Sequence, residues 1–376
     1  MEEEILELVQ RMVMTDSTQR TTEVAEVYAK FLSDHGFDAK LDEYEEGKAN
    51  VMAKIGPSGG KRIIISGHMD TVPIGDPDKW INHPFSGKVI DGELWGRGSV
   101  DMKGGTGALA GVMVELQKHE SELQSEIVLA ATADEEVGLG GARKFAEDGI
   151  MQNVTHVLIA EPTGLGVAVM EKGAMWAKIK SYGKQAHGSR PDLGHNAIEG
   201  LVKLFPDLYA VLPDISLPEV GKSSLNIGVI NGGSAANVVP EYAEVICDYR
   251  FTPGVKNESV IARLKSLLES KSSTSLQYEL EITDNLNAPP IISSTNDFAE
   301  LLATNTAKYT QSKPKLSGMY YATDGAAFLE NSPESAFAIF GPGSTELLHQ
   351  TNERLSINEL SIARKVIFDT MLGIAL

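Results

Sequence analysis

Hydrophobic residues follow two successive patterns along the chain. In the first part, short apolar runs rich in β-branched residues alternate with longer stretches in which hydrophobic residues recur at helical spacing. The runs are Arg62–Ser66, Ile127–Ala131 and His156–Ala160, and the helical stretches between them include Gly105–Gln117 and Gly141–Glu147. Strands that alternate with helices are typical of a largely parallel sheet with helices on both faces. The pattern therefore predicts an α/β domain.

The pattern changes after Lys172-Gly173. The next predicted elements are, in order, a strand at Ala174–Ser181, a helix at Asn196–Leu212, strands at Ser224–Ile230 and Ala243–Phe251, a helix at Ser259–Glu269 and a strand at Leu276–Thr283. The order β-α-β-β-α-β is that of a ferredoxin-like domain. We therefore expect an inserted ferredoxin-like domain at 174–285, and a discontinuous α/β domain made of 1–173 and 286–376. Pro289-Pro290 marks the return crossing.

Two glycine-rich segments resemble nucleotide-binding loops only faintly. The segment Gly56–Arg62 lacks the residue spacing of a phosphate-binding loop, and a strand follows it where that loop needs a helix. We interpret it as a hairpin turn between the strands at 50–55 and 62–66. The pair Gly96 and Gly98 is too short a motif to indicate dinucleotide binding.

Charge and cysteine content narrow the class of function. The formal net charge is −19, from 33 basic and 52 acidic residues, and such a field disfavours binding to nucleic acid. Cys247 is the only cysteine, which excludes an intrachain disulfide and a thiolate metal cluster. A chain without disulfides suits a reducing compartment.

The first residues do not have the pattern of a secretory signal. They are acidic, and Ile5, Leu8, Val9 and Met12 recur at helical spacing, so we expect an amphipathic helix. No run of about 18 apolar residues occurs, so no membrane span is expected. We expect a cytoplasmic protein that binds a small molecule.

Side chains that can bind a metal follow each of the three apolar runs. His68 and Asp70 come after the first run, Glu135 and Glu136 after the second, and Glu161 after the third. In open α/β sheets, ligands bind outside the carboxyl ends of the parallel strands. These side chains are therefore expected to meet at one edge of the sheet.

Two more candidate ligands lie in loops. Asp101 is in the glycine-rich segment WGRGSVDMKGG and His349 is in FGPGSTELLHQTNE. Alone, Asp101 is better explained as a helix cap, and Glu135-Glu136 as a solvated helix start. Together the residues form a set of two imidazoles and several carboxylates, which suits catalytic zinc, cobalt or manganese. A pair of such ions commonly hydrolyses amides, whereas the single-zinc protease motif HExxH is missing.

The motifs resemble those of a known family. SGHMDTVP, GRGSVDMKGG, ATADEEVG, AEPTG and HQTNE are similar, in order and spacing, to motifs of the dizinc aminoacylase and carboxypeptidase family. That family includes acetylornithine deacetylase and succinyl-diaminopimelate desuccinylase. The resemblance extends over essentially the whole chain and includes the inserted domain.

The resemblance implies roles for the candidate residues. It implies that His68 and Glu161 bind one metal ion, that Glu136 and His349 bind the other, and that Asp101 bridges the two. Asp70 resembles the carboxylate that orients the His68 ring. Glu135 resembles the general base, which takes a proton from the attacking water and passes it to the leaving amine.

The inserted domain carries further matches. His187, in GKQAHGSRP, matches a family histidine that reaches the active site of the partner subunit, where it can stabilise an oxyanion. Asn237 matches a substrate-contacting position, and Arg250 matches an arginine that often binds a substrate carboxylate. The resemblance thus implies a homodimer formed through the inserted domain.

The leading hypothesis is metal-dependent removal of an acyl group from an N-acyl amino acid. The segments around YYATDGAAFL and EKG resemble those of the desuccinylase and deacetylase branch of the family. Within that branch, an N-succinyl-diaminopimelate desuccinylase of lysine biosynthesis is the leading hypothesis. An acetylornithine deacetylase, or a dipeptidase or carboxypeptidase of the same family, remains open because all share the metal ligands. A non-catalytic relative would have lost the base or a ligand, and every one of those positions is filled.

Overall fold

The computed structural model describes residues 1–330 and 332–376, without the side chains of residues 284 and 285. The chain forms two compact units. Unit 1 comprises Met1–Met170, Ile292–Gly318 and Thr323–Leu376, and unit 2 comprises Glu171–Ile291 with Met319–Ala322. The interval 174–285 expected for the inserted domain lies within unit 2.

Unit 1 is built on a mixed β-sheet. Among the described residues its strands are, in sheet order, β1 (Lys40–Glu45), β2 (Lys48–Ile55), β6 (Glu126–Thr132), β3 (Arg62–His68), β7 (Val154–Ile159), β19 (Ala336–Ile339), β8 (Val167–Glu171) and β17 (Ile291–Ile292), with β18 (Leu316–Met319) beside β8. The central strands β6, β3, β7 and β19 are parallel. Antiparallel strands flank them on both sides. The predicted α/β fold with a largely parallel sheet is confirmed.

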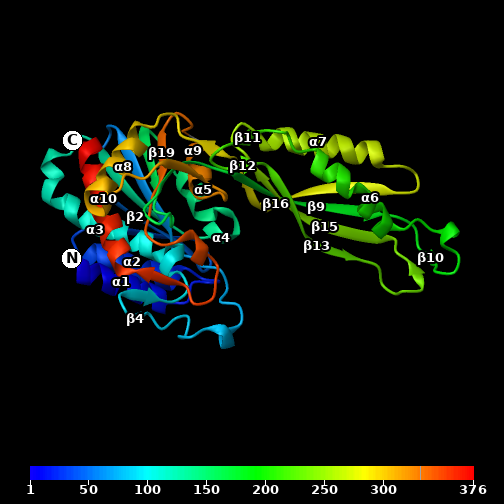
Figure 1. Ribbon diagram of the computed structural model, residues 1–376, viewed down its shortest axis with the longest axis horizontal. Coiled ribbons are helices and arrows are strands. Elements are labelled where there is room, and N and C mark those ends of the chain that lie inside the picture. The colour runs from blue at the N-terminus through cyan, green and yellow to red at the C-terminus, as the bar shows by residue number, and fades with distance from the viewer. Residues whose placement is uncertain (331) are drawn as a thin grey trace. The chain divides into compact units, whose positions relative to one another are not determined.

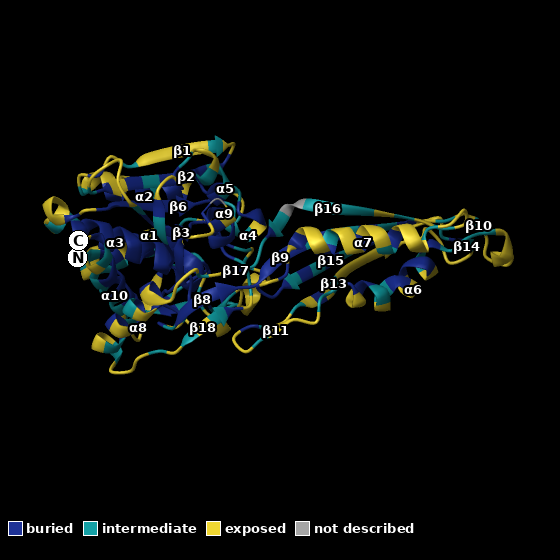
Figure 2. Cartoon of the chain, turned by 90° about the horizontal axis from the view of Figure 1, so that it is seen from above, coloured by how far each residue is buried: buried dark blue, intermediate teal, exposed yellow. Residues whose placement is uncertain are grey.

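Helices cover both faces of this sheet (Figures 1 and 2). One layer contains α1 (Glu2–Met14), α2 (Thr22–Asp34), α3 (Gly104–Leu116), α8 (Asp297–Thr310) and α10 (Ile357–Ala375), and the other contains α4 (Glu135–Gly138), α5 (Gly140–Glu147) and α9 (Gly325–Glu330). Helix α3 is buried at 12 of its 13 residues. It can lie close to the sheet because residue 105 is a glycine. A Cβ at this position would be only 2.0 Å from the carbonyl oxygen of Ala160. In the described part of the chain, no helix is both long and apolar enough to cross a membrane.

The prediction of a hairpin at Gly56–Arg62 is wrong. β2 and β3 are not neighbours, because β6 lies between them, antiparallel to β2 and parallel to β3. Every residue of β6 is buried, which suits an inner position with a partner strand on each side. The connection has to span two inter-strand spacings, roughly 10 Å, which six residues cover easily.

Unit 2 is a ferredoxin-like domain. Its main elements are β9 (Gly173–Tyr182), α6 (Ala197–Ala210), β13 (Ser224–Gly232), β15 (Tyr242–Phe251), α7 (Asn257–Lys271) and β16 (Gln277–Ala288). The strands form an antiparallel sheet in the order β13-β15-β9-β16. Both helices pack on one face through a core that includes Ile179, Leu204, Val245 and Leu264. The predicted β-α-β-β-α-β pattern is therefore confirmed.

Two short ribbons complete unit 2. The first pairs β10 (Ala186–His187) with β14 (Val238–Val239), and the second pairs β11 (Ser216–Leu217) with β12 (Gly221–Lys222). The first ribbon precedes the start of β15 and the second lies near its end, where Thr252 donates its hydroxyl to Gly221. The ribbons thus mark opposite ends of the domain (Figure 1).

Candidate metal centre

Three adjacent parallel strands deliver acidic and imidazole side chains to one edge of the unit 1 sheet. His68 is the last residue of β3 and is aligned with Thr132, the last residue of β6, which Glu135 follows after two residues. Glu161 lies two residues beyond the end of β7. His68 and Glu161 are 1% and 3% exposed. The ends of these parallel strands thus bring the side chains together at one edge of the sheet, as the sequence predicts.

Asp101 reaches the same place from the loop before α3. Its carboxylate lies between the two histidines: Oδ1 is 3.0 Å from His68 Nε2, and Oδ2 is 3.3 Å from His349 Nε2. A carboxylate that turns one oxygen toward each of two imidazoles has the geometry of a bridging ligand. Each histidine has a second carboxylate beside it, with Glu161 Oε1 3.6 Å from His68 Nε2 and Glu136 Oε2 3.1 Å from His349 Nε2.

These distances suit metal coordination. In a tetrahedral zinc site with ligand distances near 2.1 Å, neighbouring ligand atoms are about 3.4 Å apart. The ligand atoms of His68, Asp101 and Glu136 all lie within 4.8 Å of one another, and those of His68, Glu135 and Glu161 do so as well. The two sets share His68.

The electrostatics of the cluster are dominated by crowded carboxylates. Burial, and then the charges of neighbouring carboxylates, hold the pKa of Glu135 well above its ordinary value. Hydrogen bonds with Asp101 and Glu136 raise the pKa of His349 to about 10. Burial would lower the pKa of His68, but the hydrogen bond with Asp101 and the nearby carboxylates raise it well above normal. Such an excess of negative charge favours divalent cations.

One buried atom supports the same conclusion. Glu136 Oε1 has no hydrogen-bond partner among the residues that the structure describes, although Oε2 contacts His349. A buried carboxylate oxygen without a donor is costly unless it binds a cation. The residues present therefore fit a pair of divalent ions.

Asp70 contacts both the imidazole and the turn that carries the two glutamates. His68 Nδ1 lies 3.0 Å from the backbone carbonyl oxygen of Asp70 and 3.6 Å from its Oδ1. The carboxylate accepts hydrogen bonds from the backbone N–H groups of Glu135 and Glu136, at 3.2 and 3.0 Å. The Asp70 main chain thus faces the ring, and its side chain holds the Glu135-Glu136 turn in place.

Comparison with known proteins identifies the family. The model of peptidase family M20/M25/M40 matches residues 64–372. The chain belongs to this family. It is 31% identical over 358 residues to a probable succinyl-diaminopimelate desuccinylase of Staphylococcus aureus strain MSSA476, a match that covers 87% of this chain and 86% of that protein.

Solved structures share the fold of this M20 chain. An M20-family metallo-carboxypeptidase from Sulfolobus solfataricus superposes with a TM-score of 0.83 at 18% identity, over 99% of both chains. A dinuclear metal-binding M20 peptidase from Bacillus subtilis gives a TM-score of 0.75 at 17% identity, over 100% of this chain and 98% of the other. The M20 chain is a metallohydrolase that acts on amide bonds.

Sequence reasoning assigned no role to two buried acids near the M20 centre. Glu353, in HQTNE, accepts four hydrogen bonds from the loop that carries Asp101. Asp324, in YYATDGAAFL, accepts a 2.5 Å hydrogen bond from Thr132 Oγ1, and burial raises its pKa to about 7. Both lie inside motifs that the resemblance rests on, and an acid within a motif is the signal that could have singled them out.

In unit 2 the structure separates the three candidate residues. His187 is exposed, with Nδ1 2.9 Å from Ser189 Oγ, and it pairs with Val238, the residue after Asn237. Arg250 is eight residues along β15 from Tyr242, a distance of roughly 27 Å in an extended strand. Unit 2 therefore brings His187 and Asn237 together at one end and leaves Arg250 near the other.

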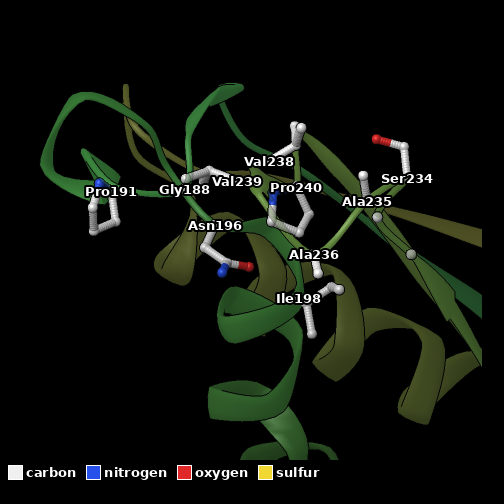
Figure 3. Close-up of a pocket in the computed structure, with 12 residues that line it drawn as sticks. Gly188, Pro191, Asn196, Ile198, Ser234, Ala235, Ala236, Val238, Val239 and Pro240 are labelled. Carbon is white, nitrogen blue, oxygen red and sulfur yellow. The ribbon is translucent and has the colours of Figure 1, made fainter.

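A pocket of about 560 Å³ opens beside His187 in unit 2. Figure 3 shows its walls, which include Asn196 and Ile198 at the start of α6 and Ala235, Ala236 and Val238 from the opposite segment. None of its twelve lining residues has an ionisable side chain. The pocket therefore offers shape and the polar side chains of Asn196 and Ser234, but no acid or base for hydrolysis.

Proposed function

We propose that this M20 protein is a two-metal amidohydrolase that removes an acyl group from an N-acyl amino acid, with N-succinyl-diaminopimelate as the leading substrate. The observation that carries the proposal is the Asp101 carboxylate, which turns one oxygen to His68 and the other to His349. The first of the two ions would be held by His68, Glu161 and Asp101, and the second by Glu136, His349 and Asp101. The similarity to the probable desuccinylase supports the choice of substrate.

Glu135 is the proposed general base. When bound, two divalent ions, for which zinc is the leading candidate ahead of cobalt and manganese, polarise the scissile carbonyl and acidify the attacking water. Glu135 takes the proton from that water and delivers it to the leaving amine. Asp70 accepts a hydrogen bond from the backbone N–H of Glu135, which holds the Glu135 backbone in place for this proton transfer.

A pair of cations in unit 2 supports a substrate with a free carboxylate. Arg250 lies close enough to Lys172 that its charge, after burial, lowers the pKa of the Lys172 ammonium. Lys172 Nζ donates to the carbonyl oxygen of Lys222 at 2.5 Å and lies 5.7 Å from the centre of the Tyr320 ring. Arg250 Nε is itself paired with Asp248 Oδ1 at 2.9 Å, but two adjacent cations outnumber that one carboxylate and favour a further anionic group.

The proposed enzyme works as a homodimer that shares His187 between subunits. Within one copy of unit 2, His187 and Arg250 are too far apart to contact the same small substrate directly, which supports a role for His187 in the active site of the partner. Helix α6 and the neighbouring strand β13 both carry exposed hydrophobic residues that a dimer would bury. These residues are Val202, Tyr209, Val229 and Ile230.

Rival substrates share the same metal ligands, so kinetics must separate them. The direct test ranks N-succinyl, N-acetyl and dipeptide substrates by kcat/KM, with zinc, cobalt or manganese and with a chelator. We expect hydrolysis to stop with the chelator and the N-succinyl amino acid to rank first. A higher rank for the N-acetyl substrates would favour an acetylornithine deacetylase, and for the dipeptides a dipeptidase. Chelator-resistant hydrolysis would refute the two-metal mechanism.

Arg250→Ala tests whether Arg250 binds the carboxylate of the substrate. Loss of a charge-assisted, bidentate hydrogen bond costs roughly 1.5–3 kcal/mol, so kcat/KM for the carboxylate substrate should fall about 10- to 150-fold. An amide analogue without that carboxylate should lose far less. Arg190→Ala is the control, since Arg190 is an exposed arginine of the same unit, paired with Asp192. Equal losses for both substrates would assign Arg250 a structural role.

A further inference from the structure

Glu353 is a completely buried carboxylate with all of its neighbours in the metal-binding unit. It is 0% exposed. Its Oε1 accepts hydrogen bonds from the backbone N–H groups of Val100 and Asp101, at 2.8 and 3.1 Å. Its Oε2 accepts from the N–H of Gly98 at 3.0 Å and from Arg97 Nη1 at 2.7 Å. Four donors converge on one carboxylate, and one of them is the main chain of the bridging residue itself.

Arg97 extends this contact to two other loops. Its guanidinium also donates to the carbonyl oxygen of Gln350 at 3.2 Å and to that of Pro73 at 3.3 Å. Gln350 follows His349, and Pro73 lies three residues after Asp70. The guanidinium is also stacked over the Trp80 ring at 5.2 Å. One ion pair thus joins the loop after β3, the loop of Asp101 and the loop of His349.

The two halves of the metal centre differ in how firmly they are held. His68 and Glu161 follow buried strands and are themselves buried. His349 lies in a loop, its side chain is 54% exposed, and its backbone φ of 59° is in the left-handed region that non-glycine residues rarely adopt. Such a loop keeps its shape only through its contacts, and Glu353, four residues on, makes the most deeply buried of them.

We propose that Arg97 and Glu353 are a positioning pair that holds Asp101 and His349 in register, so that the affinity for the second metal ion depends on it. The proposal rests on the two-metal site proposed above. The ion held by His349 and Glu136 depends on the pair twice, through Asp101 and through the His349 loop. The ion held by His68 and Glu161 depends on it only through Asp101.

Glu353→Gln removes a hydrogen-bond acceptor that holds the Asp101 and His349 loops together, but it keeps a side chain of nearly the same shape. Whichever way the amide is turned, its NH₂ group faces two N–H donors that previously had an acceptor. The loops must move apart to relieve that contact, because unpaired buried donors are costly. Loss of a group that orients metal ligands typically lowers metal affinity about 10- to 100-fold. We expect that loss for the second ion and less than about 10-fold for the first.

The test is a metal titration of the full-length protein. Metal-free wild type, Glu353→Gln and Arg97→Lys are titrated with Zn²⁺ in competition with a chromophoric chelator, and the melting temperature of each metal-free protein is recorded. Arg97→Lys keeps the positive charge but loses the planar guanidinium, whose N–H groups contact Glu353, Gln350 and Pro73. It provides the answer if Glu353→Gln does not fold.

Glu126→Gln is the matched control. Glu126 is a buried glutamate of the same unit that is paired with Arg62 at 2.6 Å, but these two residues begin β6 and β3, at the strand ends opposite the metal ligands. The control should lower the melting temperature and leave both zinc affinities unchanged. It separates a general loss of stability from a loss of the correct relative positions of Asp101 and His349.

The outcomes distinguish the two proposals. A second-ion affinity that falls about 10- to 100-fold in Glu353→Gln and in Arg97→Lys, but not in Glu126→Gln, supports the positioning pair. Wild-type zinc affinities in both variants overturn it, even when their melting temperatures fall. A wild-type protein that binds fewer than two ions overturns the two-metal site itself, and the positioning pair with it.

Discussion

Glu135 and Glu136 show how neighbouring residues of one type are placed for different roles. Both backbones are held by the Asp70 carboxylate. The Glu135 side chain lies with His68 and Glu161, whereas Glu136 lies 3.1 Å from His349. Two adjacent carboxylates on a short turn therefore face the two halves of the proposed centre, and substitution at each should have a different consequence.

Glu135→Gln should keep both metal ions and lose most of the turnover. The amide has nearly the shape of the carboxylate but cannot accept the proton of water, and loss of a general base typically costs about 10²–10⁴-fold in kcat. Metal content by elemental analysis and kcat on the preferred substrate are the measurements. Glu136→Gln is the contrasting variant and should lose one ion. Wild-type turnover in Glu135→Gln would show that another group is the base.

Among individual residues, those placed by strand order could be predicted from the sequence. His68, Glu135 and Glu161 could be grouped because each comes after an apolar run, and the ends of parallel strands meet. The partnership of Arg97 with Glu353 could not be predicted in the same way, because 256 residues separate them. A glutamate in a polar loop gives no sign that its acceptors will be buried against three backbone N–H groups.

Among the elements, β13 is an edge strand that carries exposed apolar side chains. It pairs with β15, and no other described strand covers its second edge. Val229 and Ile230 on it are 44% and 50% exposed. Uncovered edges with apolar side chains tend to pair with another chain, and natural proteins protect them with charge when they remain monomeric. Strand β13 contains no charged residue that would protect its edge, which is consistent with the proposed dimer.

Ile230→Lys should convert the proposed dimer to monomers without unfolding the chain. A lysine at a half-exposed position costs little in the monomer, but two copies would place like charges across a pairing edge. Sedimentation velocity at micromolar protein gives the answer. Ile81→Lys, at a residue of unit 1 that is 76% exposed, should leave the mass unchanged. An unaltered dimer in Ile230→Lys would place the interface elsewhere.

Element boundaries were predictable, but strand pairing was less so. Helix α7 and strands β9 and β15 lie where the periodicity placed them, within one or two residues. The connection from β2 to β3 was misjudged because a short glycine-rich turn usually joins paired strands. Here the buried strand β6, about 70 residues later in the chain, takes the position between them. The pairing of strands that are distant in sequence depends on how the whole core packs. The local pattern of hydrophobic residues therefore does not predict it.

For the whole molecule, the shared active site is the property most open to a decisive test. His187→Ala and Glu135→Gln are each expected to be inactive. When they are mixed under conditions that exchange subunits, half of the dimers are mixed, and each mixed dimer contains one intact site. About a quarter of the wild-type activity should therefore return. If His187 acts within its own chain, every site keeps one lesion and no activity returns, although mass spectrometry shows exchange.

The discontinuity of unit 1 has a consequence for the order in which the centre is assembled on the ribosome. His68, Asp101, Glu135 and Glu161 are synthesised first, and 188 residues separate Glu161 from His349. At about 5–20 residues per second, roughly 10–40 s pass before His349, the last of the proposed ligands, emerges. During that interval the carboxylates already synthesised lack His349. The Asp101 loop also lacks Glu353, whose buried carboxylate accepts its backbone hydrogen bonds. A nascent chain of this protein therefore carries only part of the proposed cation site, which is complete only after the whole of unit 2 has been made.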